Sequence, residues 1–113
     1  MADRSHFRTH ERRPVRLPAS IRKEDGAQLQ GLVVNLSLAG AGLELVDELS
    51  PGTPLLVEIT SPTLWDPLPL RGRVVWCQPG QARKPSRAGV QFVPDDSPQL
   101  FALFEVLATH AYE

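Results

Sequence analysis

The sequence predicts a mainly β fold, an antiparallel barrel or sandwich of six short strands followed by one helix. Short runs rich in Val, Leu and Ile recur along residues 15–93, and Gly and Pro turns separate them. Helical periodicity is confined to the last part of the chain. The 113 residues are enough for one domain with its own hydrophobic core, so we expect a single domain.

The expected strands are short apolar or alternating runs bounded by turn residues. The first contains Pro18, which places part of it at a sheet edge because proline cannot donate a ladder hydrogen bond. The fifth alternates apolar and polar residues, which predicts Leu70, Val74 and Trp76 on its buried face. The six predicted ranges are 15–22, 29–37, 41–45, 55–59, 68–77 and 88–93.

The predicted helix lies at the C-terminal end. Ser97 is a good N-cap, Pro98 suits the first helical position, and Asp95 and Asp96 lie near the positive end of the helix dipole. The apolar residues that follow recur at helical spacing, so we expect a helix lying across one opening or face of the barrel. That stripe consists of Leu100, Phe101, Leu103, Phe104, Leu107, Ala108 and Ala111.

The charges nearly cancel, with 12 Lys and Arg against 13 Asp and Glu, which argues against general binding of DNA or RNA. Their distribution is uneven, because residues 1–23 hold seven of the basic side chains and two of the acidic ones. We therefore expect residues 1–11 to form a flexible basic segment ahead of a single domain at 12–113.

No set of catalytic or metal-binding residues can be assembled. His6, His10 and His110 have no metal-ligand spacing with Cys77, and Ser37 lacks the glycine context of a nucleophile elbow. A single cysteine forms no intrachain disulfide, and no apolar run is long enough for a signal peptide or a membrane span. We expect a cytoplasmic protein that is not an enzyme, has no cofactor or metal, and does not insert into a membrane.

The remaining large side chains have ordinary structural explanations. We expect the aromatic residues in the core or an interface, and Cys77 as a small buried hydrophobe. Arg71 and Arg73 read as a solvated strand face. The aromatic residues concerned are Trp65, Trp76, Phe92, Phe101 and Phe104.

Two arginines ahead of the first strand form the first candidate binding group. Arg12 and Arg16 lie in "RRPVR". Guanidinium groups donate paired hydrogen bonds to phosphate or to the O6 and N7 edge of guanine. Taken alone, these arginines are better explained as a solvated basic terminus.

The second candidate group is Asn35, Ser37 and Gly40 in "NLSLAG". Residues 35 and 37 of a strand point to the same side, so both side chains can face one ligand. Gly40 allows a turn with positive φ, which would leave backbone N–H groups accessible. A turn in which Asn35 or Ser37 satisfies its own backbone is the alternative reading of the same residues.

At these residues the chain resembles the PilZ domain family, bacterial receptors for cyclic diguanylate (cyclic di-GMP). The family signature is Arg-x-x-x-Arg, followed after the next strand by Asp or Asn, x, Ser, x, x, Gly, and both parts occur here in that order. The segments "GRVVW" and "AGVQF" are also similar, so the resemblance covers residues 10–110. It implies a six-stranded antiparallel PilZ-type β-barrel with a C-terminal α-helix.

The resemblance also assigns roles. Arg12 and Arg16 are expected to hold the guanine bases and phosphates of cyclic di-GMP. Asn35 and Ser37 are expected to bond the ligand from the barrel surface, which Gly40 keeps open.

Arg8 and Arg12 have the same spacing as Arg12 and Arg16. The family motif leads directly into the first strand, and that strand starts near Arg16, so we assign Arg12 and Arg16. Arg8 and Arg13 are auxiliary candidates.

The function implied by the resemblance is a stand-alone receptor or adaptor in motility or biofilm regulation. Cyclic di-GMP would order the N-terminal arginine segment, and the signal would pass to an unidentified protein partner. The alternative is a PilZ-type interaction module that binds no nucleotide and acts in type IV pilus or motility control. Intact motifs favour the receptor. Self-association as a homodimer, and binding of one ligand or a stacked pair, are both left open.

Overall fold

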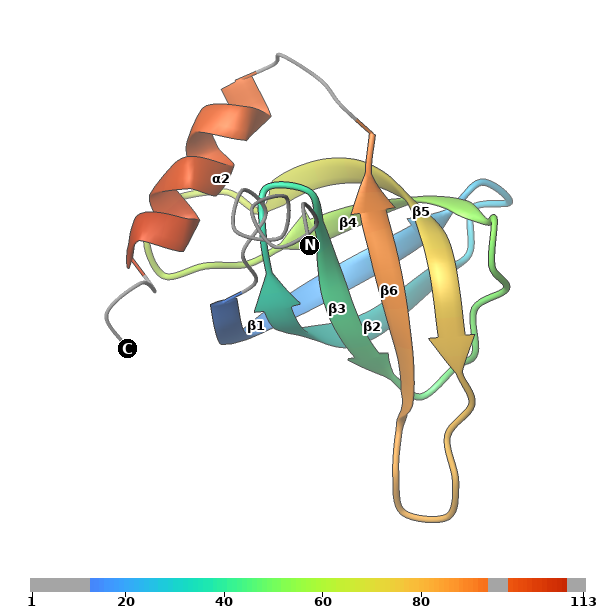
Figure 1. Ribbon diagram of the computed structural model, residues 1–113. Coiled ribbons are helices and arrows are strands. Elements are labelled where there is room, and N and C mark those ends of the chain that lie inside the picture. The colour runs from blue at the N-terminus through green and yellow to red at the C-terminus, as the bar shows by residue number, and fades with distance from the viewer. Residues whose placement is uncertain (1–12, 94–97, 110–113) are drawn as a thin grey trace, which may run out of the picture.

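The structure, a computed structural model, describes residues 13–93 and 98–109. These residues contain six strands and one helix (Figure 1). Each strand boundary lies within two residues of its predicted position. The elements are β1 (Arg13–Lys23), β2 (Gln28–Leu36), β3 (Gly40–Leu45), β4 (Pro54–Ile59), β5 (Leu68–Gln78), β6 (Ser86–Phe92) and α2 (Pro98–Thr109).

The strands close into an antiparallel barrel in the order β1-β2-β3-β6-β5-β4. Pairing of β1 with β4, which places Ala19 opposite Ile59, completes the closure. The strand pattern alone allowed a barrel or a sandwich, and the six-stranded barrel that the family resemblance implied is confirmed. Figure 1 shows the β5–β6 hairpin extending well beyond the body of the barrel.

Among the described residues, the first half of β1 pairs with a strand on one side only. β1 pairs with β2 from Arg13 to Arg22, but with β4 only from Ala19 onward. The two pairings meet at Pro18, whose carbonyl accepts a hydrogen bond of 2.9 Å from the Thr60 N–H. The prediction that Pro18 marks an edge segment is confirmed.

The core lies inside the barrel and is filled by alternate side chains of every strand. On β1, for example, Val15, Leu17 and Ile21 are buried, which turns Arg16 to the outer surface. Each fully buried Val, Leu or Ile side chain contributes about 1.5–3 kcal/mol of transfer free energy. Because a slip of one residue would turn this set outward, burial fixes the register of the strands.

Two strands contain bulges that change which side chains face outward. The register of β2 shifts between Val33 and Asn35, and that of β5 shifts between Val74 and Trp76. The extra residue in β5 turns the Trp76 side chain to the outer surface, where 42% of the residue is exposed. The prediction of Trp76 on the buried face is therefore wrong.

The helix α2 begins at Pro98, as predicted, and contacts β5 at one end of the barrel (Figure 1). Among the helix side chains that the structure describes, Leu103 and Val106 are buried, while Phe104 is 51% exposed. The predicted stripe is wrong at Phe104 and Ala108, which are exposed, and it omits Val106, which is buried. Ala102 and Leu107 pack partly buried against the same core.

The aromatic residues divide between the core and the surface. Phe92 is buried as expected, whereas Trp65 in the β4–β5 loop is fully exposed. Cys77 is half-buried, and its sulfur accepts a hydrogen bond from the Leu49 N–H at 3.4 Å. Ser97, Asp95, Asp96, Ala111 and the side chains of Leu100 and Phe101 lie outside the described residues.

We expect Leu103→Ala to lower the free energy of unfolding by about 2–5 kcal/mol, because it opens a cavity between α2 and the barrel. Phe104→Ala, on the exposed side of the same turn, should change it by less than about 1 kcal/mol. Urea denaturation followed by circular dichroism measures both. Equal losses would contradict the assigned buried face.

Candidate functional site

The β2–β3 turn is closed by Ser37, one of the predicted site residues. Its hydroxyl oxygen accepts hydrogen bonds from the N–H groups of Ala39 and Gly40, each at 3.1 Å, and the Ser37 N–H donates to the Gly40 carbonyl at 2.9 Å. The side chain is only 2% exposed. Ser37 thus forms the alternative predicted from the sequence, a turn in which its side chain bonds nearby backbone groups. It supports the β2–β3 turn from a buried position rather than facing solvent.

Gly40 has a different role from the one the sequence suggested. Within the described residues, positive φ among the glycines occurs at Gly26 and Gly52, so the expected positive φ at Gly40 is wrong. A Cβ at Gly40 would overlap the carbonyl oxygen of Val90 on β6. Glycine is required there because β3 and β6 approach closely. The N–H groups of Ala39 and Gly40, which were expected to be accessible, instead donate hydrogen bonds to the Ser37 hydroxyl.

Asn35 lies on the outer face of β2, beside the bulge. Its side-chain amide covers Gly42 of β3, because a Cβ at Gly42 would meet Nδ2 at 2.5 Å and both Cγ and Oδ1 at 2.9 Å. Asn35 is half-buried, while Leu36 next to it points into the core. Asn35 and Ser37 are thus close in sequence, but the first lies on the surface and the second beneath it.

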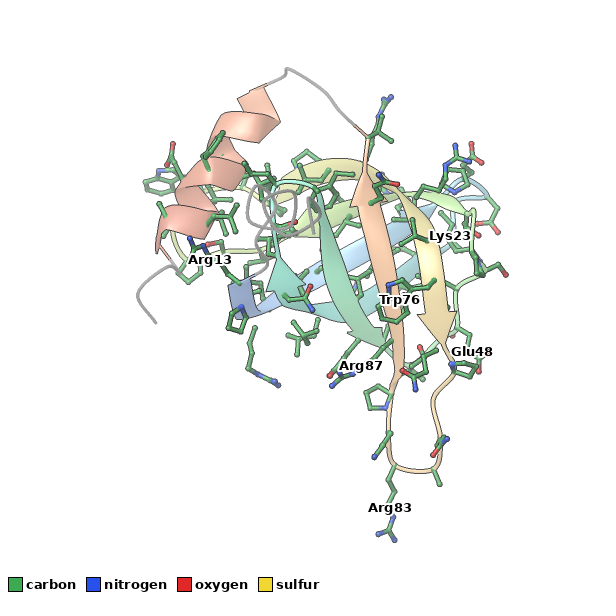
Figure 2. All side chains as sticks on the ribbon, in the orientation of Figure 1. Arg13, Lys23, Glu48, Trp76, Arg83 and Arg87 are labelled. Atoms are coloured by element: carbon green, nitrogen blue, oxygen red, sulfur yellow. The ribbon has the colours of Figure 1, made fainter. Side chains whose placement is uncertain are left out.

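Trp76 of β5 covers a glycine of β6 in the same way that Asn35 covers Gly42 of β3. A Cβ at Gly89 of β6 would overlap Nε1 of Trp76 and would lie 2.6 Å from Cε2. The indole ring therefore rests on Gly89, and Figure 2 shows Trp76 on the outside of the barrel beside β6.

Strand pairing joins these residues into one row across the barrel. Gly42 pairs with Gly89, which places the Asn35 amide and the Trp76 indole over neighbouring residues of β3 and β6. We call this the glycine row. In order across five strands it consists of Pro14, Asn35, Gly42, Gly89 and Trp76.

Arg16 borders the glycine row on the β1 side. It is exposed, and it lies in the irregular stretch of β1 between the pairs Pro14–Asn35 and Leu17–Val33. Arg16 and Asn35 are therefore on the same outer face of neighbouring strands. Arg13 is half-buried opposite Leu36, and Arg8 and Arg12 lie outside the described residues.

The described residues offer no constellation for metal binding. They contain no group of three His, Cys, Asp or Glu side chains arranged around a common point, and the three histidines lie outside them. No helix in the described ranges has the length and apolar character needed to cross a membrane.

The arrangement suits a planar ligand that carries negative charge. An exposed indole offers a stacking surface, an amide donates and accepts hydrogen bonds, and a guanidinium binds phosphate. Sequence reasoning missed Trp76 because strict alternation places it inside. The glycines of "AGLEL" and "AGVQF" are the signal for it, since side chains from neighbouring strands can lie over them.

Gly89→Ala should destabilise the protein by about 1–3 kcal/mol, because the new methyl group displaces the indole. In a Trp76→Ala background the clash is absent, so the same substitution should be neutral or stabilising by about 0.5–1 kcal/mol. Urea denaturation of the four proteins, followed by far-ultraviolet circular dichroism, gives this double-mutant cycle. An equal cost in both backgrounds would refute the contact.

Comparison with known proteins gives a consistent result. The PilZ domain family model matches residues 3–108. No curated protein matches the chain.

Solved structures with the same fold include two PilZ domains. One is the PilZ domain of CeSA from a cellulose-synthesizing bacterium, with a TM-score of 0.68 and 22% identity, over 88% of this chain and 97% of that one. The other is the PilZ domain of YcgR from Escherichia coli with c-di-GMP, with a TM-score of 0.74 and 13% identity, over 91% and 90%. MotI/DgrA, an inhibitor of motility from Bacillus subtilis, matches with a TM-score of 0.72 and 18% identity, over 91% of this chain and 50% of that one.

Proposed function

Because the chain belongs to the PilZ domain family, whose domains act as ligand-binding receptors and adaptors rather than enzymes, we propose that it is a receptor for cyclic di-GMP. The ligand binds on the outer face of β2, β3 and β6. Arg12 and Arg16 hold it from the N-terminal side, with Arg8 and Arg13 as auxiliaries. No cofactor or metal takes part.

The observation that carries this proposal is the glycine row. It supports a guanine stacked on Trp76, with its edge within reach of the Asn35 amide on the adjacent glycine. Gly40 and the buried Ser37 hold the turn that ends β2 beside this face. In this arrangement Ser37 positions the binding surface, and Asn35 and Trp76 contact the base.

The charges of the ligand fit the charges near the site. Cyclic di-GMP carries two negative phosphates, and Arg16 lies beside the glycine row on β1. A hydrogen bond to a charged group contributes about 1.5–3 kcal/mol, which corresponds to roughly tenfold to a hundredfold in affinity.

The ligand also acts as the switch. Binding orders the arginine segment against the barrel and changes the surface that a protein partner meets. The protein acts in this way as a stand-alone cytoplasmic adaptor in motility or biofilm regulation.

Calorimetric titration should give a micromolar or tighter Kd for cyclic di-GMP and no binding of GTP. Arg16→Ala should weaken binding tenfold to a hundredfold, because it removes a phosphate or guanine contact. The matched control is Arg22→Ala on the same strand and face, about 20 Å away, which should leave Kd unchanged.

Absence of heat at about 50 μM protein would mean a Kd too weak for signalling. The receptor proposal would then be abandoned in favour of a protein-interaction module on the same barrel.

Saturating cyclic di-GMP should slow amide hydrogen exchange in residues 4–18, because the arginine segment becomes hydrogen-bonded to the ligand. Mass spectrometry of peptic fragments measures this, and β4 serves as the internal reference. Unchanged exchange in residues 4–18 under conditions where calorimetry detects binding would refute the switch.

A further inference from the structure

Arg73 is an exposed cation on the outer face of β5 that the family motif does not include. Within the described part of the chain, carboxylates pair with Arg22 and Arg87, and none pairs with Arg73. Neither β5 nor β6 contains an acidic residue. Arg73 therefore presents its full charge to whatever binds beside it.

The strand register places Arg73 at the border of the candidate site. Arg73 pairs with Gln91 of β6, and Gln91 pairs with Gly40 of β3. This outward row lies next to the glycine row, because Gln91 and Gly89 are two residues apart on β6. Arg73 thus borders the site on the β5 side, as Arg16 does on the β1 side.

The distance between Arg73 and Gly40 is short enough for the Arg73 guanidinium to reach a ligand bound beside Gly40. Strands are about 4.8 Å apart, so Gly40 lies two strand spacings, roughly 10 Å, from Arg73. An extended arginine side chain covers most of that span. In the strand register Gln91 of β6 lies between the two residues, and Gly40 adds no side chain of its own.

We propose that Arg73 contacts a phosphate of the dinucleotide bound on the glycine row, so that guanidinium groups from β1 and β5 hold the ligand from opposite sides. This inference rests on the proposed function and adds a residue outside the Arg-x-x-x-Arg segment. It assigns part of the phosphate binding to the barrel itself.

Arg71 provides a matched comparison. It is also exposed on the outer face of β5, but it lies one outward row farther from the glycine row, where its carbonyl accepts a hydrogen bond from the Val93 N–H at 2.9 Å. On its other side it pairs with Leu56 of β4, two residues before Glu58. The two arginines share strand, face and exposure, and they differ in distance from the site.

The test is calorimetric titration of cyclic di-GMP into the full chain and into Arg73→Gln, Arg73→Ala and Arg71→Ala. Both substitutions of Arg73 should weaken binding about tenfold, and Arg71→Ala should change Kd by less than about twofold. The loss of affinity between 50 and 300 mM NaCl should also be smaller for Arg73→Gln than for the unsubstituted protein, because one screened contact is missing. Urea denaturation confirms that the variants remain folded.

The outcomes separate this inference from the proposed function. If the unsubstituted protein binds, and Arg16→Ala weakens binding as expected while Arg73→Gln does not, Arg73 has no contact with the ligand and only this inference fails. Equal losses for the Arg71 and Arg73 variants would indicate a general effect of strand charge and would also overturn it. Failure of the unsubstituted protein to bind would overturn both proposals.

Discussion

The candidate site depends on the absence of side chains at two paired positions, Gly42 on β3 and Gly89 on β6. A Cβ at either position would collide with the side chain that now covers it, Asn35 in one case and Trp76 in the other. The two glycines therefore allow an amide and an indole to lie close against the strands. A barrel with alanine at both positions would keep its core and lose this surface.

The two bulges work together with these glycines. Without the irregularity in β5, alternation from Val74 would turn Trp76 into a core that is already filled. The irregularity in β2 lies next to Asn35 and leaves Val33 and Leu36 both buried, three residues apart. In each strand the core stays filled, and the bulge places one side chain of the candidate site, Asn35 or Trp76, on the outer face. The bulges thus change which side chains lie on the outer surface without removing apolar side chains from the core.

Most of the fold could be predicted from the sequence, because strand periodicity and turn residues are local signals. The six strands and the start of α2 at Pro98 agree with the structure. Errors arose where tertiary contacts decide the outcome. Trp76 faces outward because of a bulge opposite β6, and Phe104 is exposed because α2 packs on the barrel through Leu103 and Val106 instead. The need for glycine at Gly40 comes from the approach of a strand about fifty residues away in sequence, which no local pattern reveals.

Within the described part of the chain, the segment of β1 before Ala19 pairs on one side only, which has a consequence for behaviour at high protein concentration. A strand with one free edge offers unpaired N–H and C=O groups on which another chain can add as an extra strand, which is a common start of aggregation. In this segment Pro14 and Pro18 lack two of the N–H donors that such pairing needs, and the exposed cation Arg16 lies between them. The residues beside the candidate site are therefore also those that discourage edge-to-edge assembly.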